Sequence, residues 1–166
     1  MLNNAGKYTG YVYVTTNGFK FTSQSDWNGT NYGAGATAGT LSTDGGAGNL
    51  TVPENGLYYF ALDLSNLTYT LTRITDMSII GSVKGNWDTD VDMAYNSADN
   101  SFSVTADLKA GVFKFRANHD WAINLGGTTD ALYQDGDNIN LAADGTYTIT
   151  VWPTFEGNSH FTIVAK

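Results

Sequence analysis

The sequence contains no cysteine and only two prolines among its 166 residues. The lack of cysteine excludes a disulfide framework and thiolate metal sites, although it does not fix a cellular compartment. No apolar run approaches the roughly 18 residues of a membrane-spanning helix, and no signal peptide opens the chain. These absences exclude a cystine-stabilised domain and a helical membrane span.

Charged side chains are also scarce. They make up 14% of the residues and leave a net charge of −8, which argues against a nucleic-acid partner because such partners require a cationic footprint. The hydrophobic content of 42% excludes wholesale disorder. The surface must therefore consist mostly of Asn, Thr, Ser and Gly. Four tryptophans and ten tyrosines on such a background are typical of extracellular sugar-handling modules.

Groups suited to catalysis are few and scattered. The two glutamates, Glu54 and Glu156, lie in separate turns and do not form a glycosidase pair. His119 and His160 are far apart in the sequence, and no Ser or Cys has the context of a nucleophile. We therefore expect a protein that is not an enzyme and that needs no cofactor.

One acidic run has the spacing of a calcium loop. Asp88, Asp90 and Asp92 alternate in the segment DTDVD, and Asp99 occupies the twelfth place. However, Met93 stands where the sharp turn of such a loop requires Gly, and the last ligand is Asp rather than the usual Glu. The pattern favours a solvated loop without metal, and calcium binding remains the open alternative.

The two halves of the chain run in step when Phe19 is aligned with Phe113. The same register pairs Lys20 with Lys114, Phe21 with Phe115 and Trp27 with Trp121, and a one-residue slip then pairs Tyr32-Gly33 with Leu125-Gly126. Further on, NLTVPENGLY (49–58) matches NINLAADGTY (138–147). Matches at this many fixed offsets predict a tandem pair of one fold, residues 1–75 and 76–166.

Within each half the apolar residues recur with a period of two. The segments that show it are LYYFALDL (57–64), SFSVTADL (101–108) and TYTITVW (146–152). This period predicts half-buried antiparallel strands, and Gly-containing turn signals separate them at the spacing of a sandwich. The predicted fold class is all-β, with two tandem immunoglobulin-like antiparallel β-sandwich domains.

The two predicted domains differ at their start. Residues 77–100 of the second have no counterpart before Tyr8, so the first lacks the opening strand and the loop that carries Trp87 in the second. We expect that this chain is cut from a longer protein; a smaller first sandwich is the alternative.

Alternation also predicts a polar face beside an aromatic residue. If Phe113 and Phe115 point into the core, the cations between and after them point outward on one sheet face, close to a tryptophan in the following connection. An indole can cover the apolar face of a sugar ring while Lys, Arg and Asn bind its hydroxyl rim. The candidate residues are Lys114, Arg116, Asn118, Trp121 and Asn124, with Trp87 completing the platform. The alternative places these tryptophans in the core, and Trp152 is interpreted as structural.

Three segments carry a resemblance to a known family. They are the G(x)5W motif at 81–87, AGVFKFRANHDWAINLG at 110–126 and GDNINLAADGTYTITV at 136–151. They resemble the repeated modules of the SusE/SusF outer-membrane starch-binding lipoproteins of Bacteroidetes, over all of 77–166 and most of 8–75. The phrase FKF…W…NYG also resembles β-sandwich modules attached to pullulanases and amylases. These are strand-and-turn phrases rather than catalytic signatures.

The resemblance implies a non-catalytic module, anchored at the cell surface, that holds α-glucan for a partner outer-membrane glycan transporter and an amylase. It implies a carbohydrate site at Trp87, Lys114 and Trp121, with Arg116, Asn118 and Asn124 as further candidates. In the first domain, Lys20, Trp27 and Tyr32 match, although the segment for the first aromatic residue is absent. A structural spacer or adhesion module, and an accessory domain of a polysaccharide hydrolase, are the alternative functions.

Overall fold

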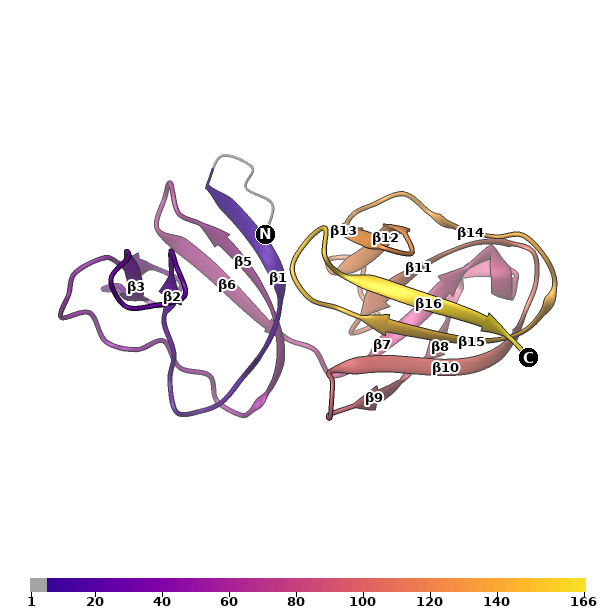
Figure 1. Ribbon diagram of the computed structural model, residues 1–166, viewed down its shortest axis with the longest axis horizontal. Coiled ribbons are helices and arrows are strands. Elements are labelled where there is room, and N and C mark those ends of the chain that lie inside the picture. The colour runs from indigo at the N-terminus through magenta and orange to yellow at the C-terminus, as the bar shows by residue number, and fades with distance from the viewer. Residues whose placement is uncertain (1–5) are drawn as a thin grey trace. The chain divides into compact units, whose positions relative to one another are not determined.

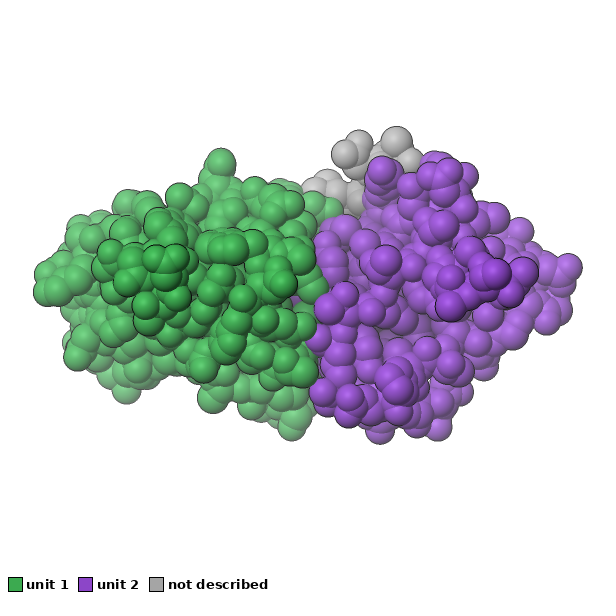
Figure 2. All heavy atoms as spheres, turned by 180° about the vertical axis from the view of Figure 1, so that it is seen from behind, with its two compact units in different colours: residues 1–2, 74–166 green, residues 3–73 purple. Residues whose placement is uncertain are grey.

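A computed structural model describes residues 6–166 and shows an all-β protein, which confirms the predicted fold class (Figure 1). The described part of the chain contains one short 3-10 turn, η1 (Ser82–Lys84), and no α-helix. Across residues 6–166, no helix has the length and apolar character needed to cross a membrane. The chain divides into two compact units between Arg73 and Ile74, which Figure 2 distinguishes by colour.

The N-terminal unit consists of two antiparallel three-stranded sheets, with the strand orders β1-β5-β6 and β2-β3-β4. Its strands are β1 (Lys7–Val14), β2 (Phe21–Thr22), β3 (Asn31–Ala34), β4 (Leu41–Ser42), β5 (Gly56–Asp63) and β6 (Thr68–Arg73). The ring centroid of Phe21 in β2 lies 5.6 Å from that of Phe60 in β5. The two sheets therefore pack face to face.

The C-terminal unit is a larger sandwich of two antiparallel sheets, ordered β16-β15-β10-β9 and β13-β12-β11-β7-β8, with β14 also paired to β11. Its strands are β7 (Met77–Gly81), β8 (Asn86–Asp92), β9 (Ala94–Asn96), β10 (Ser101–Leu108), β11 (Gly111–Ala117), β12 (Asn124–Thr128), β13 (Ala131–Gln134), β14 (Ile139–Leu141), β15 (Gly145–Trp152) and β16 (His160–Ala165). Phe161 of β16 lies 5.5 Å from Phe115 of β11 between ring centroids, so aromatic rings fill the space between the sheets.

The period of two in the sequence matches the two faces of the strands. Ile149 and Val151 in β15 are fully buried. Thr150, between them, points to the other face, where its hydroxyl lies 2.9 Å from that of Ser103 on β10. Burial of branched apolar side chains on one face and pairing of hydroxyls on the other stabilise the same strand register.

A glycine permits one close backbone approach near the candidate site. A Cβ atom on Gly126 of β12 would lie 2.3 Å from the carbonyl oxygen of Asp137. Gly33 of β3, which aligns with Gly126 in the sequence, has the same restriction, because a Cβ there would lie 2.5 Å from the carbonyl oxygen of Gly48. In each unit, therefore, a loop from later in the chain, which contains Asp137 in one unit and Gly48 in the other, can lie directly against the glycine-bearing strand.

The acidic run DTDVD does not form a loop. Residues 88–92 belong to strand β8, so the prediction of a solvated loop is wrong. The side chains of Asp90 and Asp92 bond to cationic partners on β11 and in the turn after it. Within residues 6–166, no cluster of three or more His, Cys, Asp or Glu side chains has the geometry to hold a metal ion.

Candidate functional site

Two tryptophans lie together on the C-terminal unit. The ring centroids of Trp87, in β8, and Trp121, in the turn after β11, are 5.9 Å apart, and the ring planes are tilted by 45°. Trp121 is 42% exposed and Trp87 is half-buried. Neither indole belongs to the core, so the two rings present a joint apolar surface to solvent.

An irregular strand pairing positions Trp87. Ile79 of β7 pairs with Val91 of β8, whereas Gly81 pairs with Asn86, and the register shifts between these pairs. Residues 87–90 lie within this shift. Because such irregularities re-aim side chains, the shift explains how Trp87 reaches the indole that follows β11.

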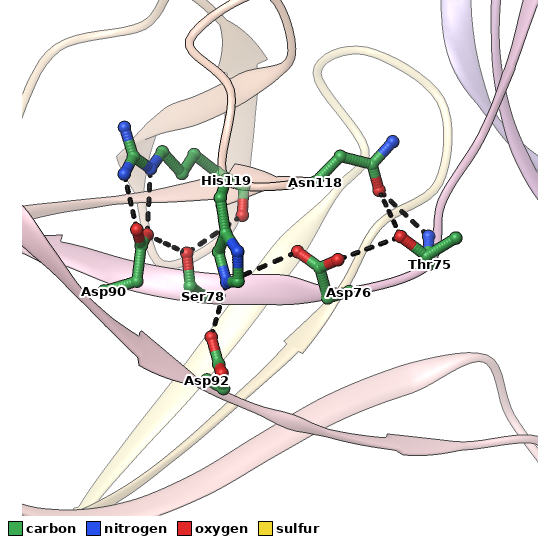
Figure 3. A network of polar contacts seen from close by, with 8 residues as sticks. Thr75, Asp76, Ser78, Asp90, Asp92, Asn118 and His119 are labelled. Atoms are coloured by element: carbon green, nitrogen blue, oxygen red, sulfur yellow. Dashed lines mark hydrogen bonds and ion pairs between the residues drawn. The ribbon is translucent and has the colours of Figure 1, made fainter.

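Arg116 differs from its expected state. It is only 8% exposed, so the prediction that it faces solvent is wrong. Its Nε–H donates to Asp90 Oδ1 at 2.8 Å and its Nη2–H donates to Asp90 Oδ2. The hydroxyl of Ser78, on the strand between β11 and β8, also donates to Asp90 (Figure 3). The guanidinium carbon lies 5.0 Å from the ring centroid of Trp121, so the indole and the carboxylate together cover the arginine.

The contact between Arg116 and Asp90 is a true ion pair. The side chains are only 10% and 15% exposed. Hydrogen bonding to Arg116 is the main cause that lowers the pKa of the Asp90 carboxyl, and the same bond raises the pKa of Arg116. Both groups are therefore charged at neutral pH, and each neutralises the other.

Lys114, by contrast, remains a potential donor. Its Nζ donates to Asn124 Oδ1 at 3.0 Å, and it forms no ion pair within the described chain. An ammonium group has three N–H bonds, so two remain for a ligand. Asn124 is 4% exposed and donates from Nδ2 to the carbonyl of Trp121 at 2.9 Å and to Asp135 Oδ1 at 2.7 Å. Asn124 therefore fixes the positions of the Lys114 ammonium group and of the Trp121 backbone.

Asn118 bonds to the start of the C-terminal unit. Its Oδ1 accepts hydrogen bonds from the backbone N–H of Thr75 at 2.9 Å and from the Thr75 hydroxyl at 3.1 Å (Figure 3). The neighbouring His119 bonds to Asp92 at 2.6 Å and lies 3.6 Å from Asp76. This turn therefore fastens the first residues of the C-terminal unit.

The N-terminal unit contains a hollow of about 490 Å³. Lys20, Trp27 and Asn31 line it, together with Thr30, Thr43, Asp44 and two glycines. Trp27 is 70% exposed, and the Nζ of Lys20 donates to the carbonyl of Ala47 at 2.7 Å. Tyr32 does not line the hollow, because it follows Asn31 in strand β3 and points to the opposite face.

One type of hydrogen bond occurs in both units, once at each of these sites. Asn31 Nδ2 donates to the carbonyl of Trp27 at 3.0 Å, as Asn124 Nδ2 does to that of Trp121. The other amide atom differs: in the N-terminal unit, Asn31 Oδ1 is buried and accepts no hydrogen bond from the described residues, whereas Asn124 Oδ1 accepts from a lysine. The asparagine of the N-terminal unit thus lacks the lysine donor that its counterpart has.

Sequence reasoning missed Asn31, Asp90 and Asp135. Asn31 had a signal, since the one-residue slip that aligns Tyr32 with Leu125 also aligns Asn31 with Asn124. The acidic run predicts a solvated loop for Asp90, and a loop gives no reason to place this residue opposite a cation. No local pattern marks Asp135, whose role depends on the loop that lies against β12.

Comparisons with known proteins add little at the level of sequence. A family model described as a domain of unknown function (DUF8037) matches residues 1–73. No curated protein matches the chain. Among solved structures, SusF from Bacteroides thetaiotaomicron aligns with a TM-score of 0.45 and 15% identity, over 97% of this chain and 49% of the SusF chain. The chain thus spans about half the length of that protein.

Proposed function

We propose that this protein binds polysaccharide without catalysis, and that the C-terminal unit holds starch-type α-glucan. The observation that carries the proposal is the indole pair Trp87–Trp121, which lies outside the core, with Lys114 bonded to Asn124, the residue that also bonds to the Trp121 backbone. The indoles supply an apolar surface for the C–H face of a sugar ring, and the ammonium group supplies donors for its hydroxyls.

The shape of the indole pair supports a curved ligand. Coplanar rings suit a straight, ribbon-like glycan. The planes of Trp87 and Trp121 are tilted by 45°, which makes the apolar surface bent. A bent surface suits a chain that turns along its length, as α-1,4-linked glucan does, and this favours α-glucan over a flat β-linked polymer.

The N-terminal unit is proposed as a second, weaker site. Lys20, Trp27 and Asn31 repeat the residue types found at Lys114, Trp121 and Asn124 in the other unit. A single indole offers less apolar surface than a pair, so we expect lower affinity here.

The equal strand registers of the two units support the proposal that they are repeats of one domain. Phe19 pairs with Leu50 as Phe113 pairs with Ile139. Together with the resemblance in sequence, this supports a module of a cell-surface assembly that includes an outer-membrane glycan transporter.

Affinity electrophoresis in gels containing soluble starch tests the proposal. We expect the wild-type protein to be retarded and Trp87→Ala to be retarded much less, with the remaining retardation due to the weaker N-terminal site. Phe155→Ala is the matched control, because Phe155 is as exposed as Trp121 but lies in a separate loop. A wild-type protein that is not retarded would contradict α-glucan binding, and a glycan array would then show whether another polymer binds.

A further inference from the structure

We infer that Asp90 is a positioning residue for the indole platform and that it and the neighbouring carboxylates restrict the site to uncharged glycans. The inference rests on the proposed function and adds to it the class of sugar that the site accepts. It also assigns Arg116 a supporting role instead of direct contact with sugar hydroxyls.

A chain of contacts leads from Asp90 to the platform. The carboxylate receives two N–H bonds from the planar fork of Arg116 and a third bond from the Ser78 hydroxyl. Two parallel bonds fix the plane of a guanidinium group, and a third donor fixes the carboxylate. The guanidinium then lies over the ring of Trp121, with its carbon 5.0 Å from the centroid. A cation held over an indole face orients the ring.

The same contacts leave Arg116 unsuited to bind a ligand directly. Its side chain is 10% exposed, and the carboxylate and the indole occupy its edge and its face. The accessible cation of the site is Lys114, whose partner is a neutral amide. A sugar at this site can therefore bond to the Lys114 ammonium group, whereas the Arg116 guanidinium is covered.

The charge around the indoles explains the restriction to uncharged glycans. Asp90 neutralises Arg116, and Asp88 and Asp120 are close enough to act on the same guanidinium electrostatically. Asp135 adds a further carboxylate beside Asn124. A sugar with a carboxylate or sulfate group would approach more negative than positive charge, whereas a neutral sugar loses nothing by this arrangement.

Near-UV circular dichroism without ligand tests the positioning role. The wild-type spectrum minus the Trp121→Phe spectrum gives the contribution of Trp121. The spectrum of Asp90→Asn minus that of Asp90→Asn/Trp121→Phe gives the same contribution without the Asp90 carboxylate. We expect Asp90→Asn to remove at least half of this signal, Asp90→Glu to restore part of it, and Asp88→Asn, the matched control on the same strand, to leave it unchanged. An unchanged signal in Asp90→Asn would overturn the positioning role.

A partly buried, unpaired arginine can unfold a protein. The double variant Asp90→Asn/Arg116→Met removes both charges and avoids this cost, and far-UV circular dichroism checks its fold. We expect it to be folded and to lack the Trp121 signal. A folded double variant that keeps the full signal would likewise overturn the inference.

Binding of two probes tests the charge restriction. We expect the wild type to bind maltoheptaose and not oligogalacturonate, and Asp90→Asn to bind maltoheptaose about tenfold more weakly. The triple variant Asp88→Asn/Asp90→Asn/Asp120→Asn, which leaves more cations than carboxylates around the indoles, is expected to gain measurable affinity for oligogalacturonate. Equal binding of both probes by the wild type would overturn the restriction. A wild type that binds neither probe, nor any glycan on an array, overturns the proposed function and the restriction with it, while the ligand-free spectra still decide the positioning role.

Discussion

Lys114 and Arg116 lie two residues apart on strand β11 and carry the same charge, but they have different roles. Arg116 is enclosed by a carboxylate and an indole, whereas Lys114 is half-buried and bonds to the neutral amide of Asn124. An enclosed ion pair orients its surroundings, and an ammonium group with spare N–H bonds is able to bind hydroxyls. At the scale of single residues, the partner decides the role.

This contrast predicts the effect of Lys114→Met. The variant removes the accessible charged donor and keeps most of the side-chain volume, so we expect affinity for maltoheptaose to fall about 10- to 100-fold, as for loss of a charged hydrogen bond. Isothermal titration calorimetry measures the change. Lys109→Met is the control, because Lys109 is exposed and pairs with Asp144. Unchanged affinity in Lys114→Met would exclude the lysine from the site.

At the scale of elements, the turn after β11 connects the site to the start of the C-terminal unit. Asn118 and His119 both have positive φ, 55° and 51°, and the N–H of Asp120 donates to the carbonyl of Ala117 at 3.0 Å. Positive φ is uncommon outside glycine, although Asn and His adopt it more often than most residues. The bonds of these two side chains to the chain at 75–76 and to β8 hold the turn in this conformation.

His119 makes the stability of this unit depend on pH. Its hydrogen bond to Asp92, helped by the charge of Asp76, raises the pKa of the imidazole above 6.5. A raised pKa in the folded state gives stability that is fully present below the unfolded value and is lost as pH rises through the folded value. We expect the urea midpoint of the wild type to fall from about pH 6.5 upward and His119→Gln to lose this dependence. His160→Gln, which changes the other histidine, should keep it; identical profiles for wild type and His119→Gln would refute the assignment.

The loop beneath Asn124 depends on Gly126. In Gly126→Ala the new methyl group would meet the backbone carbonyls of Gly136 and Asp137, which cannot move independently. We expect the free energy of unfolding to fall by about 1–3 kcal/mol, as for overpacking of a tight contact. Gly48→Ala is the control, since a methyl group there meets nothing within 4 Å. Equal unfolding midpoints for the two variants would show that the loop adjusts freely.

At the scale of the whole molecule, the sequence predicted what is periodic or repeated. Alternation in residues 146–152 predicted the buried face of β15 because side-chain direction in a strand is a local property. The pairing of Asp90 with Arg116 was not predictable in this way. It spans three strands and depends on a register shift in β8, and nothing in the sequence of that segment specifies either.

The two sites proposed for this chain, one in each unit, predict stronger binding to polymers than to short glycans. Tethered sites gain from effective concentration when one ligand reaches both. We expect the wild type to bind amylopectin at least tenfold more tightly, per binding site, than maltoheptaose, and Trp27→Ala to lose this advantage while its affinity for maltoheptaose changes little. Surface plasmon resonance with immobilised protein compares the two. Retention of the full polymer advantage in Trp27→Ala would show that the N-terminal unit does not bind.

The pairing of Arg116 with Asp90 has a consequence for the environment in which the protein works. Binding of a neutral glycan to a site whose arginine is already matched displaces few mobile ions, so ionic strength should have little influence on the affinity. Such a module would hold its polymer as firmly in brine as in fresh water.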